Sequence, residues 1–443
     1  MQLARTALAL LLGLLVLVVG SRSALARDGE TPVAGDGGAA VEPPPAPDAG
    51  APDAPPAPDA PDAAVGPPAE AAPAAPDRTS NVTIRANTEI AGYLDSTATS
   101  VLTPSLGGTV ENPTAGWAIN GRYLLDVVSA ASPDIVSTAS PNWKEVRQAG
   151  NLGFRYKPST LGVAGSVGTS YTPDYLSLSG GIQLTQELDE KNLTLVQGYG
   201  YGHDTIGRTG TPFSVFSRTL QYHSLSLGAS RVVNSGLVIG LYGDAILERG
   251  DQSKPYRYIP LFAPEVAAAI PRGASATQVQ MSRSQARPLE QLPLERDRFA
   301  LTARLAWRAG STTLRVEERG YADSWGLRAS TTDVRYFIDV SPRVTIWPHA
   351  RFNVQNGVDF WQRAYASLGA RDIPALRAGD RELGPLHTIG GGGGLRFALG
   401  KAGATEDIVL STTLDGYWTS FRDAIYVQDR LSGLTATTLD LAF

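Results

Sequence analysis

The sequence predicts an all-β protein: a transmembrane antiparallel β-barrel of about 16 strands, with a range of 14–18, preceded by a disordered segment rich in Pro, Ala and Asp. Two observations predict this class. From Asn81 onward, short segments alternate apolar and polar residues. Every second connection between these segments is a tight turn, whereas the connections between those turns include long excursions. After the N-terminal region, no stretch reaches the ~18 apolar residues that a membrane-spanning helix requires.

Residues 1–26 have the features of an export signal. Arg5 supplies a positive charge, Thr6–Ser21 carries none, and Ala24–Ala26 is a small-x-small triplet. This order is typical of a signal peptide that is cleaved after Ala26. The uncharged stretch is short for a spanning helix, so we prefer cleavage to a permanent anchor and expect an exported protein.

Residues 27–80 differ in composition from the rest of the chain. Between residues 28 and 78 lie 14 of the 31 prolines, with repeated Ala-Pro-Asp units and ten acidic residues, but no basic residue before Arg78. Such a segment has few large apolar side chains to bury and is expected to stay extended and disordered. We interpret it as a spacer in the periplasm. The alternative is that residues 28–78 dock onto a basic periplasmic partner.

The remaining chain, from residue 79 to 443, is nearly neutral. The whole chain has a net charge of −5, and the part after Arg78 carries +1. A nearly neutral domain has no nucleic-acid footprint, so no nucleic-acid partner is expected. The absence of cysteine excludes a disulfide framework and thiol chemistry. The four histidines are scattered singly, so we predict neither a metal nor another cofactor.

The alternation is clear in the segment that begins at Arg298. Phe299, Leu301 and Trp307 share one face, and Arg298 and Arg304 share the other. Period two makes such a segment a strand with one apolar and one polar face. A soluble β-sandwich would show the same alternation, so the connections must decide between the two.

The connections fall into two classes. The tight turns lie at Asn112-Pro113, Pro158-Ser159, Asp189–Asn192, Asn234–Gly236, Ala309–Ser311, Ser341–Arg343 and Lys401–Glu406, and the long excursions at Ser129–Asn142, Asp204–Phe216, Gly250–Pro293 and Arg363–Gly384. Short turns on one rim and long loops on the other are typical of bacterial outer-membrane barrels. Seven turns and eight outer connections give about 16 strands, with both termini on the turn rim. We therefore expect the outer membrane of a Gram-negative bacterium, and residues 81–443 as the barrel.

The last ten residues alternate up to a terminal phenylalanine. Leu439, Leu441 and Phe443 face one way and Asp440 the other. This ending resembles the signal that the barrel-assembly machinery reads in outer-membrane proteins. That machinery and outer-membrane lipid are the expected partners.

If the apolar faces contact lipid, the polar faces line the lumen. The residues predicted to line it are Arg298, Arg304, Arg315, Glu317, Arg319, Asp323, Asp333, Arg335, Asp339, His349, Arg351 and Arg396. We favour a structural interpretation, in which carboxylates and guanidiniums pair and brace the wall. The alternative is a selectivity surface, because seven arginines against four carboxylates would favour anionic solutes.

The sequence predicts neither a catalytic histidine–carboxylate pair nor a phosphate-binding loop. His203 and Asp204 are adjacent in a strand and point to opposite faces, so they cannot form a base–orienter pair, and no enzyme is predicted.

The run Gly390–Gly394 does not fit a phosphate loop, because Leu395 stands where a glycine is required and Ala402 stands where a hydroxyl is required. No helical pattern follows it, as a dinucleotide site would need. We place the run on a strand, where glycine lets a neighbour approach closely or lets the wall bend.

Five ordered blocks resemble an uncharacterised outer-membrane β-barrel family known as domain of unknown function 3570. The blocks are YLLDVVSAASPDIVSTASP (Tyr123–Pro141), GHDTIGRTGTP (Gly202–Pro212), KPYRYIP (Lys254–Pro260), ERGYADSWGL (Glu318–Leu327) and RELGPLHTIGGG (Arg381–Gly392). The matching positions include Asp126, Ser132, Pro133, Asp204, Gly207, Arg208, Pro255, Tyr256, Arg257, Asp323, Trp325 and His387. The resemblance covers most of residues 85–443 and not the proline-rich segment. It implies an outer-membrane barrel and transfers no catalytic or binding role.

We therefore expect an integral outer-membrane barrel that acts as a porin-like or gated channel for solute passage or export. A barrel of this size can enclose an aqueous lumen, and the loop Gly250–Pro293 is long enough to fold inward and plug it. The alternative is a structural, assembly or surface-binding protein that works with a periplasmic partner.

Overall fold

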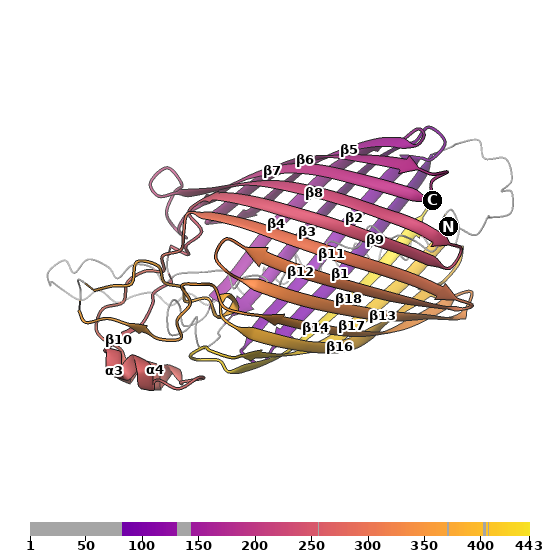
Figure 1. Cartoon of the computed structure of the whole chain (residues 1–443). Coiled ribbons are helices and arrows are strands. Elements are labelled where there is room, and N and C mark those ends of the chain that lie inside the picture. The colour runs from indigo at the N-terminus through magenta and orange to yellow at the C-terminus, as the bar shows by residue number, and fades with distance from the viewer. Residues whose placement is uncertain (1–81, 131–142, 256, 370–371, 402–404, 406) are drawn as a thin grey trace, which may run out of the picture.

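The computed structural model describes residues 82–130, 143–255, 257–369, 372–401, 405 and 407–443. Within these residues, sixteen antiparallel strands close into one barrel (Figure 1), which confirms the predicted fold class. The barrel strands are β1 (Thr83–Asp95), β2 (Thr99–Asn112), β3 (Trp117–Ala130), β4 (Trp143–Tyr156), β5 (Leu161–Thr172), β6 (Tyr175–Leu188), β7 (Leu193–Ile206), β8 (Arg218–Asn234), β9 (Leu237–Gly250), β11 (Glu295–Ala309), β12 (Thr312–Asp323), β13 (Arg328–Ser341), β14 (Val344–Gln355), β16 (Leu386–Ala398), β17 (Asp407–Phe421) and β18 (Asp429–Ala442). The signal peptide and the acidic segment lie outside the described residues and stay predictions.

Each barrel strand pairs with the next one along the chain, and the first closes on the last. β1 pairs with β18 over a register that runs from Arg85↔Ala442 to Asp95↔Ser432. The terminal Phe443 continues this seam, because its amide donates to the Ile84 carbonyl at 2.8 Å. A closed ladder satisfies the backbone groups of the wall within the protein, which a lipid environment requires.

The predicted tight turns lie at one end of the barrel and the long connections at the other (Figure 1), where β5 and β6 are also joined by a short connection. The C-terminus lies at the turn end, as predicted. Gly116 illustrates the turn chemistry, since its φ of 76° is left-handed and a Cβ there would lie 2.6 Å from the Lys157 carbonyl carbon. The excursion after Ala130 and part of the turn after Lys401 fall outside the described residues.

The long connections on either side of β11–β14 carry the remaining elements. These are β10 (Leu261–Phe262), α3 (Pro264–Ala269), α4 (Ala276–Ser282), β15 (Tyr365–Ala366) and the 3-10 helix η1 (Arg381–Leu383). We call the described residues of 251–294 and 356–385 the loop cap. None of the helices that the structure describes is long and apolar enough to cross a membrane.

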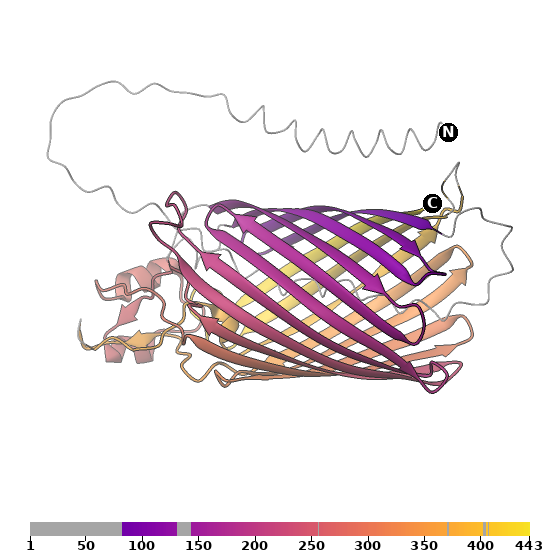
Figure 2. The same ribbon diagram turned by 90° about the horizontal axis from the view of Figure 1, so that it is seen from above.

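Most of the buried apolar side chains belong to the loop cap and the adjoining loop end of the barrel. β10 and β15 pair in parallel and join the two halves of the cap. Around them pack small apolar clusters, with Phe262, Ile270, Ala274 and Val279 in one and Ile259, Leu261 and Tyr365 in another. Viewed from above in Figure 2, the cap extends beyond the strand ends. The cap is therefore a folded unit with its own apolar packing.

Candidate functional site on the inner wall

The curvature of the barrel shows which face of each strand points inward. Side chains from strands two positions apart converge only on a concave surface. Such pairs are Arg122–Glu89 (2.8 Å; β3 and β1), Arg308–Asp339 (3.0 Å; β11 and β13) and His349–Asp415 (2.7 Å; β14 and β17). The opposite face of β11 exposes Phe299, Leu301 and Trp307. The charged face therefore lines the interior, and the apolar face is the outer wall that contacts lipid.

The twelve residues predicted to line the lumen lie on β11–β14 and β16 in the inward phase. Most of them are ion-paired. The pairs are Arg298–Glu248 (2.9 Å), Arg304–Glu317 (2.6 Å), Arg296–Asp323 (2.6 Å), Arg308–Asp339 (3.0 Å), Arg335–Asp333 (3.2 Å) and Arg351–Asp333 (3.7 Å). Arg315 lies over the Phe337 ring, 4.7 Å from its centroid, and Arg396 interacts with the charge of Asp440.

Several further carboxylates face inward that are not among the residues predicted to line the lumen. They are Glu89, Glu111, Asp126, Glu248, Asp415 and Asp440, and each interacts with an arginine or histidine. The same contacts bring Arg85, Arg122 and Arg147 onto the inner face, so the added carboxylates come with added cations. The contacts support the structural interpretation of most of the charges, in which paired side chains brace the wall.

His349 lies at the centre of this network. Its Nε2 is 2.7 Å from an Asp333 oxygen and its Nδ1 is 2.7 Å from an Asp415 oxygen. A protonated imidazole donates from both nitrogens, so two charge-assisted hydrogen bonds connect β13, β14 and β17. Within the described residues, no group of histidine and carboxylate side chains has an arrangement that could hold a metal ion.

The contact between His349 and Asp415 depends on a glycine. β16 lies between their strands, and Gly392 is the register partner of both residues. A Cβ at this position would lie 2.6 Å from the Asp415 Cα. The missing side chain therefore lets the imidazole and the carboxylate meet across β16.

The other inward-facing glycines of the run Gly390–Gly394 have the same role. A Cβ on Gly390 would lie 3.1 Å from the Tyr417 Cγ, and one on Gly394 would lie 2.8 Å from the Trp347 Cη2. Both rings thus lie across β16 from the neighbouring strands. Of the two roles expected for glycine here, the close approach of a neighbour is the one observed. Sequence alternation assigns Tyr417 and Trp347 to the inner face, but it gives no register and so cannot show what they cover.

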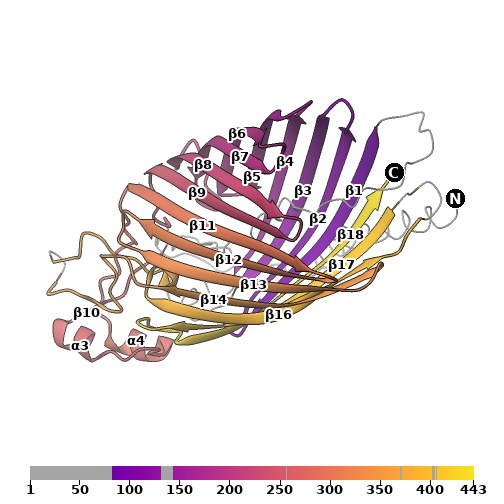
Figure 3. The ribbon, with the colours of Figure 1, turned by 45° about the vertical axis from the view of Figure 1, so that its right-hand side comes forward.

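The loop between β9 and β11 contacts distant parts of the barrel rim. Asp251 pairs with Arg218 at 2.7 Å, and Lys254 interacts with the charge of Glu145 on β4. Further along the loop, Arg272 donates to the Ser420 hydroxyl on β17 at 2.7 Å. Figure 3 places α3 and α4 beyond the loop ends of β14 and β16. The loop that is long enough to plug the lumen therefore reaches across the mouth, with its helices outside the barrel.

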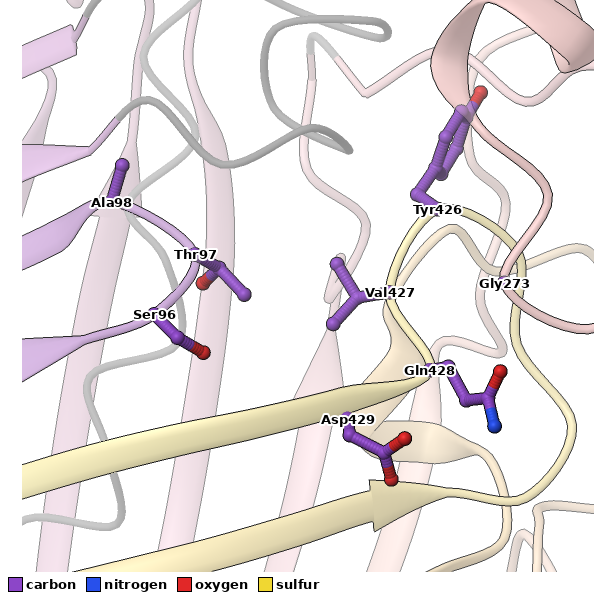
Figure 4. A pocket seen from close by; sticks show the side chains of 8 residues that line it. All are labelled: Ser96, Thr97, Ala98, Gly273, Tyr426, Val427, Gln428 and Asp429. Atoms are coloured by element: carbon purple, nitrogen blue, oxygen red, sulfur yellow. The ribbon is translucent and has the colours of Figure 1, made fainter.

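A cavity of about 540 Å³ lies where the loop meets the rim (Figure 4). Its lining residues are Ser96, Thr97, Ala98, Gly273, Tyr426, Val427, Gln428 and Asp429. Ala98 and Tyr426 have φ values of 62° and 63°, a left-handed conformation that is unfavourable for residues other than glycine. The loop is joined to the rim here by two backbone hydrogen bonds of 2.9 Å, from the Gly273 amide to the Ala424 carbonyl and from the Tyr426 amide to the Ala274 carbonyl.

The five sequence blocks described above lie at the loop end of the barrel and in the loop cap, and the last of them extends to Gly392 in the middle of β16. They occupy the loop ends of β3, β7, β12 and β16 and the start of the loop cap. Asp126 binds Arg147 at 2.7 Å, Arg257 lies 3.5 Å from Asp380, and Asp323 accepts from the Trp325 amide at 2.9 Å. Ser132, Pro133 and Tyr256 lie outside the described residues. These matching positions thus hold the loop end together rather than the middle of the lumen.

A sequence profile of the family "Protein of unknown function (DUF3570)" matches residues 62–420. The chain belongs to this family. The match begins within the proline-rich segment, which the blocks did not cover, and ends in β17. A comparison with curated proteins finds no match.

Solved barrels with similar folds include CdiB from Acinetobacter baumannii, at 10% identity and a TM-score of 0.42, covering 82% of this chain and 60% of that one. OprD from Pseudomonas aeruginosa has 7% identity and a TM-score of 0.39, with 82% and 95% covered. The outer membrane protein opdK from the same organism has 7% identity and a TM-score of 0.38, with 82% and 99% covered. These likenesses concern the fold alone.

Proposed function

We propose that this protein is a porin-like channel of the outer membrane that passes small polar solutes, with the loop between β9 and β11 as its gate. The observation that carries the proposal is the polar inner face of a closed sixteen-strand barrel. A barrel of this size is too wide for its wall side chains alone to fill, whereas a barrel of about eight strands is not.

The two sides of the inner face differ in chemistry. The wall of β11–β14 is charged and ion-paired, as described above. The wall of β5–β8 carries many small side chains in its inward phase, which are Ser166, Gly168, Ser170, Ser177, Ser179, Gly181, Gly198, Gly200, Ser224 and Ser226. Larger side chains stand among them, since the Tyr222 ring lies over Gly202 and the Tyr242 ring lies over Gly228. Where these side chains are small, this wall fills less of the interior than the charged wall does, and its serine hydroxyls support passage of hydrated polar solutes.

A pair of engineered cysteines tests both the channel and its gate. The chain has no native cysteine, and a Cβ on Gly273 would lie 3.1 Å from the Gln428 Cβ, a few tenths of an ångström shorter than the ~3.5–4.5 Å of a disulfide. In planar bilayers, oxidised G273C/Q428C is expected to conduct less than wild type and to recover on reduction. The single variants G273C and Q428C, treated in the same way, control for strain at the left-handed Gly273.

The outcomes separate the two parts of the proposal. If wild type and the reduced double variant both fail to conduct, the protein is not a channel. If both conduct and oxidation changes nothing, the loop is not the gate.

A surface-binding role is the second candidate, and the folded loop cap is the observation that favours it. The cap has its own apolar clusters and a cavity at its seam with the rim. Loss of a cell-surface phenotype on deleting 251–294, with conductance unchanged, would favour this candidate.

A further inference from the structure

One arginine of the charged wall differs from its neighbours. Arg319 lies midway along β12 in the inward phase, in register with Thr302 on β11 and Thr331 on β13. The other inward arginines of β11–β14 each contact a carboxylate or an aromatic ring. Among the residues that the structure describes, Arg319 has no ion pair, hydrogen bond or ring contact.

The carboxylates near Arg319 already bind other cations. Glu317, two residues before it, accepts from the Arg304 Nε at 2.6 Å. Asp323, four residues after it, is fully buried and accepts from Arg296. Each of these neighbours therefore has a partner of its own, and the Arg319 guanidinium is a surplus cation on this wall.

The third nearby carboxylate, Asp333, belongs to the His349 network. It accepts from His349 at 2.7 Å and lies 3.2 Å from the Arg335 Nε. In the β13 register it stands opposite Glu317, two residues along the strand from Thr331, the register partner of Arg319. Asp333 therefore already has several cationic partners other than Arg319.

Hydroxyl groups flank the surplus cation. Thr331 accepts a hydrogen bond from the Asn353 amide at 2.8 Å, which leaves its own hydroxyl hydrogen free to donate. A guanidinium presents several N–H donors in a planar fork that matches the two oxygens of a carboxylate or phosphate. A hydroxyl donor beside that fork adds a further hydrogen bond to the same group.

We propose that Arg319, with Thr331, is a binding site for a small oxyanion, a carboxylate or a phosphate, on the inner wall. The site rests on the proposed function, because the oxyanion reaches it through the lumen. The site is local. The other charges of this wall have partners, so the attraction for the oxyanion comes from the one unpaired guanidinium.

The test measures binding and conduction separately on the full chain. Isothermal titration calorimetry of the detergent-solubilised protein uses sodium gluconate and inorganic phosphate as probes, which distinguishes the two sources of oxyanion. Wild type is expected to bind at least one probe. R319Q is expected to bind it about tenfold or more weakly, because a charged hydrogen-bond donor is lost, and R319K to fall between the two. Folding of each variant is checked by its heat-dependent mobility on a gel.

The matched control is R231Q, which removes the same charge from the outer wall of β8. It is expected to bind like wild type. In bilayers, the reversal potential in a KCl gradient is expected to shift toward cation preference in R319Q only. If wild type binds neither probe, or if R319Q and R231Q bind alike, the site is refuted whether or not the protein conducts. If binding is lost in R319Q but no protein conducts, the site stands and the channel proposal fails.

Discussion

Replacing Gly392 with alanine tests whether the glycine run exists to let side chains cross β16. The new Cβ would lie 2.6 Å from the Asp415 Cα, so Asp415 must move and its hydrogen bond to His349 must break. A lost hydrogen bond to a charged group costs about 1.5–3 kcal/mol, and overpacking adds about 1–3 kcal/mol. We expect G392A to lower the free energy of unfolding by about 3–5 kcal/mol.

Gly391→Ala is the matched control in the same strand. Gly391 faces outward, and a Cβ there would lie 3.4 Å from the His349 carbonyl oxygen, an ordinary contact. Alanine also restricts the unfolded chain, so G391A should be neutral or more stable by up to about 1 kcal/mol. The assay is urea unfolding of protein refolded into lipid vesicles, followed by tryptophan fluorescence. Equal unfolding midpoints for G391A and G392A would refute the reasoning.

Two further predictions concern the loop cap. Glu290, whose side chain is 1% exposed, accepts from the amides of Lys254 and Gly379 and so joins the two halves of the cap. E290A leaves those buried amides unpaired, which costs about 1–3 kcal/mol of cap stability. Proteolysis of protein in vesicles should therefore cleave the cap faster while the strands stay protected. An unchanged cleavage rate would contradict this. Burial raises the pKa of Tyr365 from 10.0 to about 12. The neutral phenol donates to the Phe360 carbonyl at 3.2 Å, and ionisation would remove this bond and bury a charge. Cap stability should therefore be complete below pH 10 and fall as the pH rises toward 12; the rate of cap cleavage should show this dependence in wild type and lose it in Y365F.

The faces of the strands could be predicted because alternation is a local property. Phe299 and Arg298 differ in face whatever strand lies beside them, since successive side chains of a strand point to opposite sides. Register is not local. That His349 meets Asp415 depends on which residues of three strands stand opposite one another, and the glycine between them belongs to a strand 40 or so residues away from the imidazole along the chain.

The loop cap could not be predicted, for a different physical reason. β10 is two residues long, and its parallel partner β15 lies about a hundred residues later in the chain. Such short elements have no periodicity to detect, and they are stabilised by contacts between distant segments such as Glu290 and Gly379. Loop length alone suggested a plug, whereas these contacts keep the loop folded at the mouth.

For Glu318, the outward-facing phase could be predicted from the sequence, but its hydrogen bonds to neighbouring strands could not. It stands in the outward phase between Glu317 and Arg319, and Ser330 and Thr332 donate to its two oxygens at 2.6 and 2.5 Å. A carboxylate on the lipid-facing wall is costly, and removing its donors costs about 1.5–3 kcal/mol for each hydrogen bond. S330A/T332A should therefore destabilise the barrel in the vesicle assay. Adding E318L should restore most of the loss, because replacing a whole polar group by apolar side chains is nearly neutral. If S330A/T332A is equally destabilising with Glu or Leu at position 318, the hydroxyls do not act through the carboxylate.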